Sequence, residues 1–374
     1  MTVFGTRPEA IKMAPLVLSL KKRNEIFDEV TVVTGQHREM LDQVLDIFKI
    51  KPSYNLNIMK SRQTLADITS SVILKLGQVI AKEKPDIVLV HGDTTTTFAA
   101  SVSAFYQRTK IGHVEAGLRT WNKYSPYPEE MNRQLTDVLS DLYFAPTDQS
   151  RFNLLKENHP KGRIFVTGNT AIDALNQTVR TDYHHAVLDL IDPTKKMILV
   201  TMHRRENQGE PMRRVFKVMR EVVESRPSVE IVYPVHLNPV VQEAADSILG
   251  NHLRIHLIDP LDVVDFHNLA ARSYFIMTDS GGVQEEAPSL KKPVLVLRDT
   301  TERPEGVQAG TLKLVGTDPK TVKKAMLKLL DDDNEYQRMA EARNPYGDGH
   351  ASERILNAIL FEFGRLQSRP ESFK

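Results

Sequence analysis

Cysteine is absent from all 374 residues of the sequence. This absence excludes disulfide bonds, thiolate nucleophiles and cysteine metal sites together. It agrees with a reducing compartment, and no basic and apolar leader pattern precedes the first strand-like run. We therefore predict a cytoplasmic protein.

An excess of charge of either sign is also missing. The 49 basic and 48 acidic residues leave a formal net charge of +1, too little to hold a nucleic acid or an anionic membrane by long-range attraction. No apolar run approaches the ~20 residues that are needed to cross a bilayer. We predict neither partner, so an anionic ligand would have to be held by local groups.

Two domains are predicted from the length, because domains average roughly 150 residues. Short β-branched runs alternate with longer helical stretches, a pattern typical of βαβ units and parallel sheets. The clearest runs lie at residues 2–4, 30–34, 86–90, 143–145, 197–201, 230–234, 274–278 and 293–297. We predict an α/β fold with two Rossmann-like, doubly wound domains, residues 1–165 and 166–351, and a C-terminal segment, 352–374, whose amphipathic helix covers 352–366.

Polar clusters follow these runs one after another, as in GTRPE, HGDTTTT, MHRREN and DSGGVQEE. In open α/β sheets, ligands bind just beyond the carboxyl ends of the strands. Because the clusters occur in both halves of the chain, we expect two binding faces that meet at a cleft.

The stretch TDSGGVQEE leads from an apolar run into a helix. Ser280, Gly281 and Gly282 would present backbone N–H groups without Cβ obstruction, and a helix N-terminus favours an anion such as a diphosphate. Glu286, about one turn later, could accept hydrogen bonds from the hydroxyls of a ribose. The alternative is a tight turn whose acidic residues, Glu285 and Glu286, merely suit the helix dipole.

Two further loops carry fixed positive charge. GTRPEAIK contains Arg7 and Lys12, and RDTTERPE contains Arg298, Glu302 and Arg303. A proline costs ~3 kcal/mol inside a helix, so we expect the first helix to begin at Pro15, after an irregular turn. Charged loops of this kind can also be surface ion pairs.

Carboxylates at the strand ends give the sharper signal. Asp93 lies in HGDTTTT, Glu115 in GHVEAGLRT, and Glu129 in YPEEMNR one helical turn before Arg133. His203 follows a strand of the second half. Such a set suits general acid and base chemistry, because crowding and burial separate the pKa values of its members. Any one of them could instead be structural, for example as a helix cap.

Missing motifs narrow the reaction. No GxGxxG follows a strand, and neither GxxxxGK[ST] nor HExxH occurs, so a nicotinamide, a P-loop and a zinc-protease site are not indicated. His203 and Glu206 have a spacing that could bind a metal, but a lone pair is weak support. We predict no cofactor and no metal, and a sugar nucleotide as the ligand.

The motifs also occur in the order known from one enzyme family. GTRPEAIKMAPL, QHREMLDQVL, HGDTTTT, GHVEAGLRT, YPEEMNR, HRREN, PVHLNP, TDSGGVQEEAPSL and RDTTERPEG cover nearly the whole chain. The sequence resembles the non-hydrolysing UDP-N-acetylglucosamine 2-epimerases, most closely those of Gram-positive bacteria. The resemblance implies the glycosyltransferase-B architecture, with the last helix returning to the N-terminal domain, and a homodimer.

The implied reaction interconverts UDP-N-acetylglucosamine and UDP-N-acetylmannosamine, a precursor of cell-surface polysaccharides. UDP leaves C1 as the C2 proton is removed, and it returns after proton delivery to the opposite face of 2-acetamidoglucal. The resemblance assigns catalysis to Asp93, Glu115, Glu129, Arg133 and His203. It assigns contacts with UDP to Arg7, Lys12, His236, Phe266, Ser280, Gly281, Gly282, Glu286 and Arg303.

Many bacterial members of that family also bind a second UDP-N-acetylglucosamine as an allosteric activator. The matching positions here are Gln36, Arg62, Arg204 and His236, while Glu39 stands where glutamine is expected. The rival readings are a glycosyltransferase of the same fold, a hydrolysing 2-epimerase and a nucleotide-sugar sensor without catalysis. The three carboxylates and the GDTTTT and HRREN segments argue against the glycosyltransferase, and the intact set of carboxylates with His203 argues against the sensor. The sequence separates the hydrolysing enzyme less cleanly.

Overall fold

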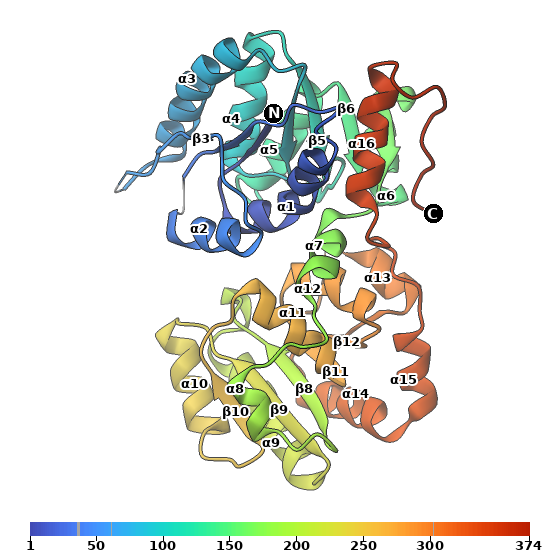
Figure 1. The fold of residues 1–374 in the computed structure, drawn as a ribbon. Coiled ribbons are helices and arrows are strands. Elements are labelled where there is room, and N and C mark those ends of the chain that lie inside the picture. The colour runs from blue at the N-terminus through green and yellow to red at the C-terminus, as the bar shows by residue number, and fades with distance from the viewer. Residues whose placement is uncertain (36–37, 61, 302) are drawn as a thin grey trace. The chain divides into compact units, whose positions relative to one another are not determined.

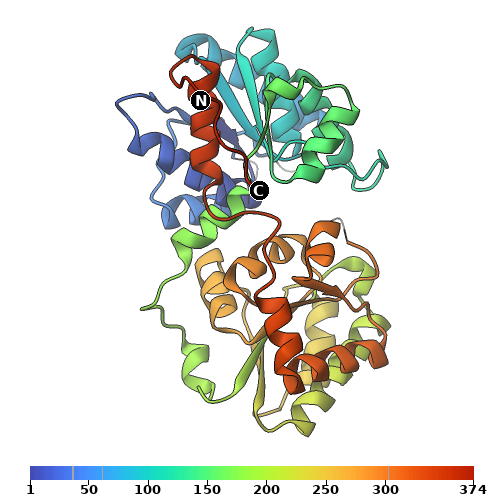
Figure 2. The ribbon, with the colours of Figure 1, turned by 90° about the vertical axis from the view of Figure 1, so that its right-hand side faces the viewer.

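The chain folds into two compact units in a computed structural model that describes residues 1–35, 38–60, 62–301 and 303–374. Unit 1 comprises Met1–Gln177 and Tyr346–Lys374, and unit 2 comprises Thr178–Pro345. Figure 2 shows the C-terminal segment running back from unit 2 into unit 1, where the chain ends.

Unit 1 is built on a seven-stranded parallel sheet with the strand order β3-β2-β1-β4-β5-β6-β7 (Figure 1). Its strands are β1 (Thr2–Phe4), β2 (Thr31–Val33), β3 (Tyr54–Asn55), β4 (Ile87–His91), β5 (Lys110–Val114), β6 (Leu142–Ala145) and β7 (Ile164–Val166). The order reverses between β1 and β4, and the crevice beyond such a switch point is where open α/β sheets bind ligands.

Helices cover both faces of this sheet. They are α1 (Arg7–Lys22), α2 (Arg38–Ile47), α3 (Leu65–Glu83), α4 (Thr95–Tyr106), α5 (Glu129–Leu139), α6 (Asp148–Lys156), α7 (Thr170–Thr178) and α16 (Ala351–Glu362), with a 3-10 turn, η1 (Lys161–Arg163). One buried cluster joins the sheet to α1, α2 and α16, and a second joins it to α3 and α4. Through Ile355 and Ile359, α16 belongs to the core of unit 1.

Unit 2 repeats the plan with a six-stranded parallel sheet in the order β10-β9-β8-β11-β12-β13. Its strands are β8 (Lys196–Thr201), β9 (Val229–Pro234), β10 (Ile255–Ile258), β11 (Phe275–Thr278), β12 (Val294–Val296) and β13 (Leu312–Leu314). The switch point lies between β8 and β11, where the MHRREN and DSGGVQEE segments begin.

The helices of unit 2 also pack on two faces of their sheet. They are α8 (Ala186–Leu190), α9 (Glu210–Ser225), α10 (Pro239–Leu249), α11 (Val263–Arg272), α12 (Gly281–Glu286), α13 (Pro304–Ala309), α14 (Pro319–Asp331) and α15 (Asp333–Ala340), with the 3-10 turns η2 (Arg205–Asn207) and η3 (Ala287–Leu290). Within the described ranges, no helix is long and apolar enough to cross a membrane.

The predicted α/β class and parallel sheets are confirmed, but two details differ from the sequence-based expectation. The units divide after Gln177 rather than after residue 165, because β7 pairs with β6 and Ala174 of α7 lies in the core of unit 1. The first helix begins at Arg7 rather than at Pro15.

Strong start signals explain the early beginning of α1. Thr6 caps the helix and forms a capping box with Glu9, and Pro8 occupies its first turn. Pro15 lies inside the helix, where it lacks the N–H of an ordinary residue, but Met13 and Leu16 beside it are fully buried. Packing of the apolar face therefore offsets the cost of the proline.

Candidate functional site

The switch point of unit 1 is held together by Glu9, a buried carboxylate that the sequence analysis did not single out. Glu9 Oε2 accepts hydrogen bonds from the backbone N–H groups of Gly5 (3.1 Å) and Thr6 (2.8 Å). Glu9 Oε1 accepts from the hydroxyls of Thr94 (2.7 Å) and Thr97 (3.1 Å). The turn after β1 is thereby fixed to the start of α4, directly beside Asp93.

Glu115 lies at the end of β5 among three polar partners. Its Oε2 is 2.5 Å from Lys12 Nζ, 3.0 Å from Asn169 Nδ2 and 3.6 Å from His91 Nε2. Burial alone would raise the pKa of Glu115, but the Lys12 ammonium, followed by the His91 ring, holds it well below its ordinary value. Glu115 is therefore ionised and can accept a proton.

Asp93 follows β4 and is paired with Arg133 of α5. Arg133 Nη2 lies 2.5 Å from Asp93 Oδ2, and Asn132 Nδ2 donates to the Asp93 carbonyl at 3.0 Å. Thr94, rather than Asp93, caps α4, so the carboxylate of Asp93 is not used as a helix cap. About a quarter of the Asp93 side chain stays exposed, which leaves it open to a ligand.

The two glutamates that open α5 have different surroundings. Glu130 is fully buried and accepts from the backbone N–H groups of Thr120 and Trp121, both at 3.0 Å. Glu129 is half-buried, and among the described residues its carboxylate has no hydrogen-bond or ion-pair partner. Arg133 lies 3.3 Å from Glu130, so the helical pair expected between Arg133 and Glu129 is made with the neighbouring glutamate instead.

In unit 2, the Ser280–Gly282 turn links β11 to α12. Ser280 is the N-cap residue, yet its side chain makes no capping hydrogen bond. A Cβ on Gly281 would lie 2.6 Å from Arg303 Nη1, so only glycine lets this guanidinium approach the turn. Arg303 Nε donates to Glu285 Oε1 at 2.8 Å. Glu285 thus orients Arg303 beside the turn, and Glu286 is the glutamate that remains for a ligand.

Glu286 contacts His267, which in turn contacts Thr178 at the end of α7. Thr178 Oγ1 lies 2.6 Å from His267 Nδ1, and His267 Nε2 lies 3.4 Å from Glu286 Oε2. The Glu286 side chain is 15% exposed. Phe266, next to His267 on α11, is partly buried against the core of unit 2.

His203 and His236 lie together at the ends of β8 and β9. Their rings are stacked with centroids 5.2 Å apart. Partial desolvation lowers the pKa of His203, and the neighbouring His236 and Arg204 act in the same direction. The N–H groups of His203 and Arg204 both donate to Asp279, at 3.0 and 2.9 Å, so Asp279 ties this loop to the Ser280 turn.

The predicted residues thus fall into two groups. Unit 1 brings Lys12, Asp93, Glu115 and Arg133 to one switch point, with Arg7 in the first turn of α1 and Glu129 at the start of α5. Unit 2 places most of its predicted residues around the other switch point, namely His203, Arg204, His236, Ser280, Gly281, Gly282, Glu286 and Arg303. Phe266 instead lies on α11, against the core of unit 2.

Two of the predicted activator positions lie in unit 1. Arg62 is exposed and has a positive φ of 59°, and Gln36 lies outside the described residues. In the part of the chain that the structure describes, no group of three His, Cys, Asp or Glu side chains is arranged to hold a metal ion.

The sequence analysis did not single out several polar residues that the structure shows to be buried. They are Glu9, His91, His113, Arg119, Glu130, Asp137, Asn169 and Asp279. A signal existed for α5, because Glu130, Arg133 and Asp137 share one helix face and are all buried. Each of the others has at least one partner that is far away in sequence, so only the folded chain shows that contact.

Comparison with known proteins identifies the family. A family model described as UDP-N-acetylglucosamine 2-epimerase matches residues 19–360. The chain belongs to the UDP-N-acetylglucosamine 2-epimerase family. It is 64% identical to the UDP-N-acetylglucosamine 2-epimerase of Bacillus subtilis, over 100% of this chain and 98% of that protein. Its function is that of an isomerase of this family.

Solved structures agree with this assignment. A UDP-N-acetylglucosamine 2-epimerase structure from Listeria monocytogenes is similar with 60% identity and a TM-score of 0.95, covering 100% of this chain and 98% of that one. The Neisseria meningitidis enzyme, solved with UDP-GlcNAc bound, is similar with 49% identity and a TM-score of 0.86, covering 96% of this chain and 99% of that one.

Proposed function

We propose that the chain interconverts UDP-N-acetylglucosamine and UDP-N-acetylmannosamine by elimination and re-addition. The C1–O bond breaks and its electron pair leaves with UDP, while the C2–H electron pair forms the C1=C2 double bond of 2-acetamidoglucal. The C2 proton passes to a protein base. Addition of UDP at C1, with protonation of C2 on the opposite face, completes the epimerisation.

The carboxylate of Glu115, only 10% exposed and fixed by polar partners at the end of β5, is the observation that carries this proposal. A C2 hydrogen that is not next to a carbonyl is scarcely acidic, so its removal needs a carboxylate that is unprotonated, desolvated and fixed. Lys12 Nζ at 2.5 Å and Asn169 Nδ2 at 3.0 Å fix Glu115 in this way. Asp93, paired with Arg133, and Glu129, which has no partner among the described residues, supply the other proton-transfer positions.

Besides Arg7 and Lys12 of unit 1, which remain predicted UDP contacts, this proposal assigns UDP binding to residues of unit 2. The N–H groups of Gly281 and Gly282 and the guanidinium of Arg303 suit a diphosphate, and Glu286 suits the two ribose hydroxyls. His203, whose lowered pKa favours the neutral ring, suits a hydrogen-bonding or proton-transfer role near the leaving group. The Neisseria relative, solved with UDP-GlcNAc bound, supports this choice of ligand.

Three further properties are predicted only from the family resemblance and the amino-acid composition. They are activation by a second UDP-N-acetylglucosamine through Gln36, Arg62, Arg204 and His236, a homodimer, and a cytoplasmic location. For activation, the reverse reaction should start slowly from pure UDP-N-acetylmannosamine and accelerate when a trace of UDP-N-acetylglucosamine is added. A reaction without such a lag would contradict activation.

Cleavage of the C1–O bond is tested by positional isotope exchange. UDP-N-acetylglucosamine carrying ¹⁸O in the C1–O–P bridge is incubated with the protein, and ³¹P NMR follows the label. Reversible elimination predicts that ¹⁸O moves from the bridge into the non-bridging positions of the β-phosphate without any acceptor. A glycosyltransferase would turn over only with an acceptor, a hydrolysing enzyme would accumulate UDP and free N-acetylmannosamine, and a sensor would leave the label in place.

A further inference from the structure

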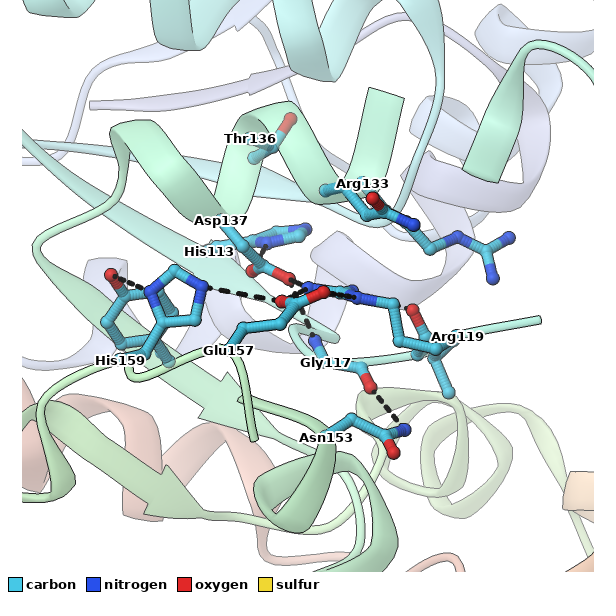
Figure 3. Close-up of polar contacts among 12 residues, drawn as sticks. His113, Gly117, Arg119, Arg133, Thr136, Asp137, Asn153, Glu157 and His159 are labelled. Atoms are coloured by element: carbon cyan, nitrogen blue, oxygen red, sulfur yellow. Dashed lines mark hydrogen bonds and ion pairs between the residues drawn. The ribbon is translucent and has the colours of Figure 1, made fainter. Parts of the chain in front are cut away.

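A buried network of charged groups connects β5, α5 and the loop that follows β5 (Figure 3). His113 of β5 and Asp137 of α5 are both fully buried, and Nδ1 of the histidine lies 2.6 Å from Oδ1 of the aspartate. Nε2 of His113 lies 2.7 Å from the carbonyl oxygen of Gly92. Asp137 Oδ2 accepts from the backbone N–H of Gly117 at 3.3 Å.

Both ring nitrogens of His113 face oxygen atoms that can accept a hydrogen bond. A carbonyl oxygen can only accept, so Nε2 must donate to Gly92. Burial alone would raise the pKa of Asp137, but His113 and Arg119 hold it below its ordinary value, so this carboxylate is ionised and also accepts. His113 therefore lies between two acceptors, the Asp137 carboxylate and the Gly92 carbonyl.

Arg119 extends the network with alternating charge. Its Nη2 lies 2.6 Å from Asp137 Oδ2, and its Nε lies 2.9 Å from Glu157 Oε1. His159 Nε2 is 3.5 Å from Glu157, and His159 Nδ1 is 3.0 Å from the Tyr143 hydroxyl. Each buried charge is thus paired, which is the condition under which a polar core can rigidify its surroundings.

The backbone held by this network carries two of the candidate catalytic carboxylates. Gly92 precedes Asp93, and Gly117 lies two residues after Glu115. Glu115 itself has a left-handed φ of 67°, a conformation that persists only where neighbouring contacts enforce it. Asn153 Nδ2 donates to the Gly117 carbonyl at 2.9 Å, and a Cβ on Gly117 would lie 2.3 Å from the Ser150 carbonyl oxygen.

We propose that His113 and Asp137 are positioning residues that fix the loops bearing Asp93 and Glu115 at a common spacing. Neither contacts the substrate, and their effect on the reaction passes through backbone groups at Gly92 and Gly117. This inference rests on the proposed function, because it assumes that the two carboxylates transfer protons. A misplacement of about 1 Å in such groups can lower a rate by ~10²-fold.

Two substitutions separate the two hydrogen bonds of His113. In H113N, the side-chain amide can replace Nδ1 toward Asp137 but cannot reach Gly92, whereas in H113Q it can replace Nε2 toward Gly92 but loses Asp137. H256Q is the matched control, because His256 Nε2 pairs with Glu230 at 2.8 Å on the first half of β9, away from the switch point. All variants are studied as full-length protein.

A positioning role predicts that folded H113N loses kcat by ~10²-fold while the KM for UDP-N-acetylglucosamine changes little, and that H113Q retains more activity. The control variant H256Q should keep the wild-type kcat even if its Tm is lower. Equal kcat for H113N and the wild type, at equal folded fraction, would overturn the proposal. Wild-type protein that forms no UDP-N-acetylmannosamine from UDP-N-acetylglucosamine in the same assay would instead reject the proposed function.

Two measurements keep the inference testable if the His113 variants do not fold. ¹⁵N NMR of the wild-type imidazole should show both ring nitrogens of His113 protonated, and a neutral ring would contradict the network. N153A removes the hydrogen bond to the Gly117 carbonyl, together with the one that Asn153 Oδ1 accepts from Gln149 Nε2, and leaves every charge in place. It should lower kcat without raising KM, and an unchanged kcat would count against positioning of the Glu115 loop.

Discussion

At the scale of single residues, the environment of Glu115 sets how the reaction should depend on pH. Lys12 is the strongest influence that keeps the Glu115 pKa low, so K12Q should raise that pKa toward its ordinary value. The acidic limb of the kcat/KM profile should then move to higher pH. K110Q is the control, since Lys110 pairs with Glu362 at the opposite end of β5. An acidic limb that stays in place in K12Q would exclude Glu115 as the essential base.

For single residues, the sequence analysis identified charged residues that directly follow strands, because both the charge and the position after an apolar run can be read from the sequence. Asp93, Glu115 and Lys12 were predicted as site residues, and the structure brings all three to one switch point. Glu9 and Asn169 were not found, because their contacts with Thr94 and Glu115 span many residues of sequence. A glutamate in a capping box looks the same in the sequence whether or not it also binds a second loop.

At the scale of elements, the first turn of α5 combines a structural carboxylate, Glu130, with a proposed catalytic one, Glu129. E130Q should leave a buried backbone N–H of Thr120 or Trp121 without its acceptor, at a cost of about 1–3 kcal/mol in the free energy of unfolding. E129Q should leave stability nearly unchanged but lower kcat by ~10²–10⁴-fold, as expected for a proton-transfer group. Denaturant unfolding and initial rates of both variants test this. A loss of stability in E129Q together with a loss of kcat alone in E130Q would refute the assignment.

The eight runs read from the sequence correspond to β1, β2, β4, β6, β8, β9, β11 and β12, whereas β3, β5, β7, β10 and β13 were not predicted. The apolar runs that correspond to β4, β8 and β11 are buried and read as strands directly. The two-residue β3 and the partly exposed β13 carry little apolar signal, and they form only because a neighbouring strand offers its edge. The predicted start of α1 at Pro15 was wrong, because the capping box at Thr6 and the burial of the apolar helix face offset the free-energy cost of a proline inside the helix.

At the scale of the whole molecule, the proposal divides labour between the two units. D93N alters unit 1 and should lower kcat by ~10²-fold or more while the Kd for UDP stays the same. E286Q alters unit 2 and should weaken UDP binding by ~10-fold or more, because a charged hydrogen-bond acceptor for the ribose is lost. Isothermal titration calorimetry with UDP, together with initial rates, tests the division. A large loss of UDP affinity in D93N would contradict it.

Proton removal at C2 is the central claim, and exchange with solvent tests it most directly. The protein is incubated with UDP-N-acetylglucosamine in D₂O, and proton NMR follows the C2 hydrogen and the products. Elimination and re-addition predict that UDP-N-acetylmannosamine forms with deuterium at C2 and that the remaining substrate slowly gains deuterium as well. Epimer that retains its C2 protium, or binding without exchange at saturating substrate, would contradict the account.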